Sequence, residues 1–314
     1  MKKSIAAAAF CALGMATLAQ AMAAEITVER NERGATVKID GRLFTEYRID
    51  SNGKSILWPL IGPTDKPITR AYPMDKADAH GTTDHVHHRS VWFGHGDVNG
   101  IDFWTEKPNH GSIRHRDFVK IGNGDPALVV TRNDWIGPQG DKQCEDQRTL
   151  RFGVDGDNRW IDFDIALKAT AGPVHFGDTK EGCFAVRVAD TMTVDAKQGG
   201  QIVNHRGQKD AKAWGQAAEW IDYHGPVDGE TVGIAIFNHP DSFRFPTRWQ
   251  VRNYGLFAAN PSGPSAFAKG KKNDSFTLPA GESLTLRYRI WLHRGDHREG
   301  KVAEACAAYV GSAP

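Results

Sequence analysis

The stretch DHVHHRSVWFGHGDVNGIDFW, from Asp84 to Trp104, concentrates side chains that can move protons or bind metals. The chain has 13 histidines, and five of them lie between His80 and His95. Each imidazole needs partners for two ring nitrogens and titrates near neutral pH. This concentration predicts a functional site. It leaves three alternatives open: a metal site, an acid/base site or a polar lining for a sugar.

A metal site would use His85 and His87, which are two residues apart and project to the same side of an extended strand. Two imidazoles completed by a carboxylate and another histidine suit zinc, iron or manganese. Arg89 opposes this interpretation, because its permanent positive charge would lie on the same face. We therefore expect no metal here, and a metal-dependent enzyme remains the alternative.

A sugar site explains more of the stretch. Sugars present hydroxyls at their edges and C–H groups on their faces, so they suit pockets of mixed polar groups and aromatic rings. A histidine whose pKa is near the working pH can also transfer a proton. A structural role is the simpler explanation for Trp92 and Phe93, which are typical of a strand core. The remaining candidates of the stretch are His85, His87, His88, Arg89, Asp97, Asn99 and Trp104.

Later segments add polar residues to the same predicted site. Glu181 lies where a loop meets an apolar strand, and partial burial there would raise its pKa toward neutrality. We therefore predict that Glu181 is a general acid or base. A salt bridge from Glu181 to Lys180 or Arg187 is an equally open interpretation. The further candidates are Glu145, Lys180, His239, Arg248 and Tyr254.

Short alternating runs dominate the chain and predict β-strands separated by turns such as NERG, DGDN and PVDGE. In the run 159–169, Ile161, Phe163, Ile165 and Leu167 share one face. The fold class is therefore all-β, a large antiparallel two-sheet sandwich with long functional loops. A helix is expected over 298–311, packed outside as a C-terminal cap. The other predicted strands span 26–30, 35–40, 127–135, 184–194, 231–237 and 284–293.

The first 23 residues combine two lysines, an apolar run and small residues, and predict a secretory signal peptide. Residues 24–314 are expected to form a single domain that is periplasmic or secreted. Removing Lys2 and Lys3 changes the formal charge from +1 to −1, so nucleic acid is not an expected partner. No later stretch reaches the about 18 apolar residues of a membrane helix, so no membrane insertion is expected.

The motifs HVHHRSVWFGHGDVNGIDFW, GDTKEGCFAVRVAD, EWIDYHG and NHPDSFRFPTRWQVRNYGLFAANP follow one another in this order. Together they resemble a family of exported bacterial proteins labelled methane oxygenase (PmoA-like), and the resemblance covers nearly all of the mature chain. The family pattern is often similar to HPHHR and RWHVR, so Val86 and Gln250 are departures. A methane-oxygenase subunit crosses the membrane several times, and this chain is not expected to cross it once.

The resemblance implies a different chemistry. Members of such a family look like neighbours or fusion partners of keto-sugar hydrolase domains and of sugar-type NAD oxidoreductases. Their strand pattern resembles the galactose-mutarotase supersandwich, an analogy of fold. We expect an enzyme that moves a proton on a sugar or 3-keto-glycoside, by cleavage or epimerisation, without a cofactor. A non-catalytic sugar-binding module is the second alternative.

The predicted roles follow from that chemistry, which needs a base, an acid and groups that stabilise an oxyanion. His87 or His88 and Glu181 are assigned to proton transfer, and Arg89 and Arg248 to charge stabilisation. The expected partner is a small-molecule carbohydrate. The residues predicted to bind it are His85, Asp97, Asn99, Trp104, Glu145, Lys180, His239 and Tyr254.

Overall fold

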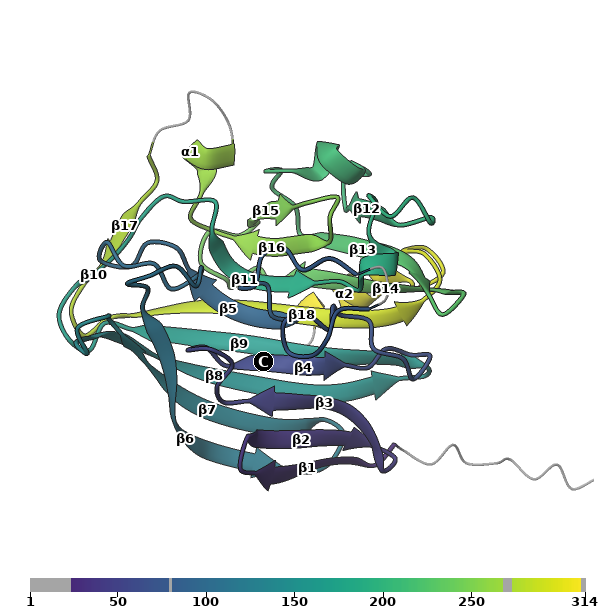
Figure 1. The fold of residues 1–314 in the computed structure, drawn as a ribbon, viewed down its shortest axis with the longest axis horizontal. Coiled ribbons are helices and arrows are strands. Elements are labelled where there is room, and N and C mark those ends of the chain that lie inside the picture. The colour runs from purple at the N-terminus through teal and green to yellow at the C-terminus, as the bar shows by residue number, and fades with distance from the viewer. Residues whose placement is uncertain (1–23, 79–80, 268–272, 312–314) are drawn as a thin grey trace, which may run out of the picture.

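A computed structural model describes residues 24–78, 81–267 and 273–311 of the chain. The predicted signal peptide lies outside the described residues. The predicted all-β architecture is confirmed: two eight-stranded antiparallel sheets pack against each other (Figure 1). We call them sheet I and sheet II.

Sheet I contains the strands on either side of the histidine-rich stretch. Its order is β1-β2-β3-β4-β5-β11-β16-β15. The bounds are β1 (Ile26–Asn31), β2 (Gly34–Ile39), β3 (Arg42–Arg48), β4 (Ile56–Leu60), β5 (Val91–His95), β11 (Gly182–Arg187), β15 (Arg248–Val251) and β16 (Leu256–Asn260).

Sheet II contains the long central strands, in the order β12-β13-β14-β18-β9-β8-β7-β6. The bounds are β6 (Ser112–Gly122), β7 (Ala127–Ile136), β8 (Lys142–Asp155), β9 (Asn158–Lys168), β12 (Gln201–Asn204), β13 (Trp220–Val227), β14 (Glu230–Asn238) and β18 (Ser283–Arg294). The predicted turn DGDN joins β8 to β9, and PVDGE joins β13 to β14.

The remaining elements are short. Two strands form a separate small sheet, and two 3₁₀ turns and two α-helices complete the described chain. They are β10 (Val174–Phe176), β17 (Phe276–Leu278), η1 (Asp190–Met192), η2 (Asp210–Ala213), α1 (Pro264–Phe267) and α2 (Val302–Gly311).

The main hydrophobic core lies between the two sheets. The predicted face of β9 is confirmed, because Ile161, Phe163, Ile165 and Leu167 are all buried. Phe163 meets Phe184 of β11 with ring centroids 4.7 Å apart, so the contact joins sheet II to sheet I. Fully burying side chains of this size stabilises the fold by about 1.5–3 kcal/mol each.

Shortening one of these side chains should have a measurable but moderate cost. We expect Ile165→Val to lower the free energy of unfolding by about 0.5–1.5 kcal/mol, because it leaves a small cavity. Val119 on β6 is 49% exposed, so Val119→Ala should change it by less than about 0.5 kcal/mol. Urea unfolding of both variants measures the difference. Equal losses would contradict this assignment of the core.

Two predicted boundaries are wrong. The strand expected over 184–194 ends at Arg187, because the chain turns into η1 and Thr193 donates its backbone N–H to the carbonyl of Asp190 (3.2 Å). The C-terminal helix begins at Val302 instead of Arg298. The four residues before it form a turn in which the carbonyl of His297 accepts the N–H of Val302 (3.0 Å).

Different parts of the chain pack on the outer faces of the two sheets. On sheet II, α2 buries Val302, Cys306 and Tyr309 against β13, β14 and β18, so the predicted external packing of the helix is confirmed. On sheet I, a smaller apolar layer includes Trp92 and Trp104, and polar loops lie above it. Among the described residues, no helix is long and apolar enough to cross a membrane.

Candidate functional site

His85 to Arg89 form a tight turn, and not the extended strand that the metal alternative requires for His85 and His87. The N–H of His88 bonds to the carbonyl of His85 (2.9 Å), and His85 has a φ of 44°. Two buried cations hold this turn: Arg70 donates to the carbonyl of His85 (3.0 Å), and Lys54 to that of His87 (3.4 Å). The regular strand β5 begins at Val91, after the turn.

Four rings stack on the outer face of sheet I. Tyr254 lies on His85, His85 on His88, and His88 on Trp92, with centroid separations of 5.0, 4.7 and 5.3 Å. The predicted strand-core position of Trp92 is confirmed, since this side chain is 1% exposed. Trp104 is also fully buried and lies 5.1 Å from Trp92. The stack therefore stands on an apolar base.

A buried pair of arginines flanks the stack. Arg70 and Arg187 both donate to Oδ1 of Asp84, at 2.6 and 3.1 Å. The guanidinium of Arg187 also lies 4.8 Å from the ring centroid of Tyr254. Burial opposes ionisation of Asp84, but Arg187 and hydrogen bonds from His85 and Arg70 lower its pKa to about 2. Two permanent positive charges thus share one carboxylate.

His85 and Asp84 form a hydrogen-bonded dyad. Nδ1 of His85 lies 2.5 Å from Oδ2 of Asp84. The carboxylate is ionised at neutral pH and accepts the Nδ1–H, which leaves Nε2 of the ring as the free nitrogen. The His85 side chain is 39% exposed. His85 is therefore the imidazole of the stack that a solute can reach.

The other two imidazoles of the turn, those of His87 and His88, have a different environment. Burial, together with the nearby charges of Lys54 and His85, lowers the pKa of His87 to about 4. Burial and the same kind of neighbouring charge lower the pKa of His88 well below its ordinary value, and Nδ1 of His88 lies 3.4 Å from Nη1 of Arg187. Both rings are neutral at pH 7.

The pKa of His87 gives a prediction with a definite sign. In the unfolded chain the ring has an ordinary pKa of 6.5, against about 4 when folded. The unfolded state therefore binds more protons between these values, and His87's contribution to stability is lost as the pH falls from 6.5 through 4. NMR titration, with the resonance assigned by its loss in His87→Gln, should give a midpoint near 4. A midpoint near 6.5 would contradict this environment.

Arg89 is not free to meet a substrate. Its Nε and Nη2 donate to the two carboxylate oxygens of Glu106, at 2.5 and 2.8 Å. Lys54 lies 3.5 Å from the same carboxylate and donates to the carbonyl of Trp104 (2.9 Å). Burial is the main reason that the pKa of Lys54 falls to about 8. The structure thus places Arg89 in the support of the histidine turn.

Glu181 lies at the other end of β5 from the histidine turn. Its carbonyl accepts the N–H of Gly96 (2.7 Å), just after β5, whereas His88 lies before Val91, the first residue of β5. The Glu181 carboxylate is ion-paired with Lys180, and Nε2 of Gln250 donates to it (3.3 Å). The predicted salt bridge to Lys180 is confirmed.

Arg252 connects the two ends of this face. Arg252 interacts with the hydroxyl of Tyr254. Burial lowers the pKa of Lys180, and the positive charge of Arg252 lowers it further. Gly255, with a φ of 107°, follows Tyr254, and a Cβ there would lie 2.9 Å from Thr193. The glycine thus permits the turn that places Tyr254 on His85.

Arg248 lies on the edge strand β15. Its Nη1 donates to the carbonyl of Gly215 (2.8 Å). Together with Asn260 and Arg244 it lines a cavity of about 280 Å³ beyond the histidine turn. The predicted contribution of Arg248 to a common site remains a prediction.

Asp97 and Asn99 support a loop. Oδ1 of Asp97 accepts the N–H of Gly100 (3.0 Å). Asn99 donates to Gln143 (2.8 Å) and accepts the N–H of His175 (2.7 Å). These contacts tie the loop after β5 to β8 and β10, away from the ring stack.

Glu145 lies on β8 of sheet II, and His239 directly follows β14 of the same sheet. Glu145 is ion-paired with Arg116 (3.0 Å) and Lys142 (2.8 Å). His239 packs against Tyr309 of α2, with ring centroids 5.2 Å apart. Neither residue lies on the face of sheet I that carries the histidines.

A cavity of about 840 Å³ lies beside the arginine pair and contains no residue that the sequence analysis singled out. Asp190, which lines it, bonds to the hydroxyl of Thr82 (2.9 Å), and that hydroxyl accepts hydrogen bonds from Arg70 and Arg187. Arg70, Lys54 and Glu106 were also missed. None of them belongs to a concentration of chemically unusual residues, so no local pattern marks it.

Residues 34–307 match the model of a family of unknown function, DUF6807. The chain belongs to this family. The methane-oxygenase label has no support in that match. No curated protein matches the chain.

Several solved structures are similar in fold. A polysaccharide lyase has a TM-score of 0.33 and 14% identity, with 88% of this chain and 33% of that chain covered. The galactosidase domain of an α-galactosidase–sucrose kinase has a TM-score of 0.37 and 11% identity, with coverages of 85% and 40%. A glycoside hydrolase family 97 enzyme from Pseudoalteromonas sp. strain K8, bound to panose, has a TM-score of 0.34 and 10% identity, with 86% of this chain and 34% of that chain covered. The chain thus spans well under half of each structure.

Proposed function

We propose that this DUF6807 protein is an exported, periplasmic or secreted, carbohydrate-active enzyme that transfers a proton on a sugar or 3-keto-glycoside. The observation that carries the proposal is the Asp84–His85 dyad, with Nδ1 and Oδ2 2.5 Å apart, stacked between Tyr254 and His88. A carboxylate that holds one ring nitrogen fixes the tautomer and leaves the other nitrogen as a base.

In this proposal His85 takes an acidic proton from the carbon beside the sugar carbonyl through Nε2. It then gives that proton to the leaving glycosidic oxygen, whose bond to the adjacent carbon breaks as a carbon–carbon double bond forms. Epimerisation needs in addition a second acid on the opposite face of the ring, because His85 reaches one face only. His87, which is neutral because burial lowers its pKa to about 4, accepts a hydrogen bond from a substrate hydroxyl. His87 and His88 are the histidines predicted for proton transfer, but His88 is 1% exposed and packs against His85.

The charges beside the dyad suit an oxyanion. Arg70 and Arg187 are both ion-paired with Asp84, and Asp190 is a second carboxylate near Arg187. Fixed guanidinium groups beside a reacting carbon stabilise negative charge that develops on an enolate oxygen. We assign this role to Arg187 in place of Arg89, because Arg187 lies beside the ring stack, 4.8 Å from the ring centroid of Tyr254. Arg187 is fully buried, so it acts through its charge and not by contact with the substrate.

Glu181 and Lys180 mark the far end of the same face. Glu181 is ion-paired with Lys180 and hydrogen-bonded to Gln250, so we assign it to substrate contact instead of proton transfer. The Glu181–Lys180 pair and Arg252 then contact the part of the substrate that lies away from His85. Stacked rings and neighbouring cations make the histidine turn a poor match for a metal, because metal-bound imidazoles direct their nitrogens at one point.

One observation favours a non-catalytic sugar-binding module instead. The acid predicted for catalysis, Glu181, is half-buried and ion-paired with Lys180. The deciding experiment is a screen of glycosides and their 3-keto derivatives with product analysis. Products that require loss of the proton beside the carbonyl support the enzyme. Binding of a glycoside without any turnover across the panel supports the module.

A further inference from the structure

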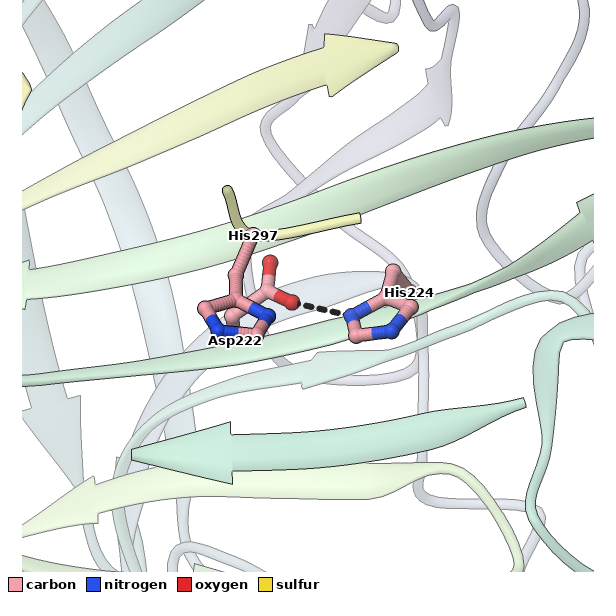
Figure 2. A group of neighbouring side chains, drawn as sticks. All are labelled: Asp222, His224 and His297. Atoms are coloured by element: carbon pink, nitrogen blue, oxygen red, sulfur yellow. Dashed lines mark hydrogen bonds and ion pairs between the residues drawn. The ribbon is translucent and has the colours of Figure 1, made fainter. Parts of the chain in front are cut away.

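A second polar cluster lies on the outer face of sheet II, far from the ring stack. Asp222 and His224 are alternate residues of β13 and project to the same side, and His297 lies in the turn before α2 (Figure 2). The sheet strand and the turn are separated by more than 70 residues of chain. Packing of α2 on sheet II brings them together.

The three side chains converge. One potential ligand atom from each lies within 4.8 Å of the other two. Oδ1 of Asp222 is 2.5 Å from Nδ1 of His224, and the rings of His224 and His297 are 5.8 Å apart. Ligands about 2.1 Å from a tetrahedral ion are about 3.4 Å apart, so an ion needs only small side-chain shifts here.

Hydrogen bonding within the described residues leaves one atom of this cluster unexplained. Asp222 is fully buried and His224 is 6% exposed. Nδ1 of His297 is also buried, and it has no hydrogen-bond partner among the described residues. Buried polar atoms are normally paired, so this nitrogen points to a ligand that completes the cluster.

The carboxylate is held in place from behind. Oδ2 of Asp222 lies 2.8 Å from Nε2 of His293, whose Nδ1 is 3.0 Å from the carbonyl of Arg294. The His293 ring fits against Gly233 and Gly300, where an added Cβ would come within 2.2 and 2.1 Å of it. Partners of this kind orient metal ligands and fix their tautomers.

We propose that Asp222, His224 and His297 bind a divalent transition-metal ion of the zinc class. Two imidazoles and one carboxylate are typical zinc ligands, and three protein ligands leave a fourth position for water. His297 is the least buried of the three, so the fourth position opens toward the surface. The ion would fasten the turn before α2 to β13. It lies on the opposite sheet from the ring stack and is independent of the proposed sugar chemistry.

The test uses the mature protein without a polyhistidine tag. After chelator treatment, calorimetric titration with ZnCl₂ should show one equivalent bound, and Zn²⁺ should raise the melting temperature. His297→Gln should weaken binding at least about tenfold, whereas His297→Cys, which restores a zinc ligand, should retain it. His175→Gln is the matched control, because His175 is exposed on β10 and should leave Zn²⁺ affinity unchanged.

Two outcomes would overturn the site. One is the absence of both heat and thermal shift in the unaltered protein. The other is equal Zn²⁺ affinity in the unaltered protein and His297→Gln. If His297→Gln does not fold, the comparison of His297→Cys with His224→Gln replaces it, and equal Zn²⁺ affinity in these two variants counts equally against the site.

Discussion

Replacing Asp146 with alanine is expected to lower the free energy of unfolding by about 3–5 kcal/mol, because it leaves a charge unpaired in the core. Arg148 is fully buried between the sheets, and its Nε and Nη2 donate to Asp146 at 3.0 and 3.1 Å. Asp146 also accepts hydrogen bonds from Asn133 (2.6 Å) and Trp135 (2.8 Å). One carboxylate therefore satisfies several buried donors.

Urea unfolding with an unchanged m-value measures this loss. Asp134→Ala is the matched control on the neighbouring strand, since Asp134 is 24% exposed and its ion pairs should contribute at most about 1 kcal/mol. A double variant, Asp146→Ala with Arg148→Met, should recover much of the loss because it removes both charges. If Asp146→Ala costs no more than Asp134→Ala, the buried pair is not the support we describe.

This network also shows a feature of the core that the sequence alone does not predict. Alternation along 127–135 and 159–169 predicted β7 and β9, and burial confirms those faces. The same alternation in CEDQR places Asp146 and Arg148 on the inner face of β8 beside Leu150. Charged residues are almost never fully buried unless paired, so their types alone suggest a solvent position. The pairing that permits burial depends on neighbouring strands.

The candidate site was also predictable only in part, because some of its contacts come from distant segments. The histidine-rich stretch was visible because unusual residues lie close together in sequence. Its turn was not visible, because the cations that hold it come from Lys54 and Arg70 on other segments. Tyr254 reaches His85 only because β11 pairs with both β5 and β16. The backbones of Glu181 and His87 lie at opposite ends of β5, and their common site remains a prediction.

His85→Gln is expected to lower kcat by about 10²–10⁴-fold on any substrate that the screen identifies, because it removes the proposed proton-transferring nitrogen. Substrate binding should change little, since glutamine keeps a polar side chain at the turn. His87→Gln should mainly raise KM, because His87 contributes a hydrogen bond in this proposal. Glu181→Gln should also act on KM, because this proposal assigns Glu181 to substrate contact. Steady-state kinetics and equilibrium binding of the same substrate separate these effects.

The matched control is His239→Gln, a buried histidine on sheet II that should leave kcat and KM unchanged. Asp84→Asn adds a second measurement, because it removes the carboxylate that orients His85 while keeping the ring. A dyad requires Asp84→Asn and His85→Gln to lower kcat together, and the double variant to lose little more than either single one, since residues that act as a unit are not additive. If binding and kcat instead fell by the same factor in His85→Gln and His87→Gln, the histidines would serve as contacts only. The stack of rings would then be a binding surface without a catalytic base.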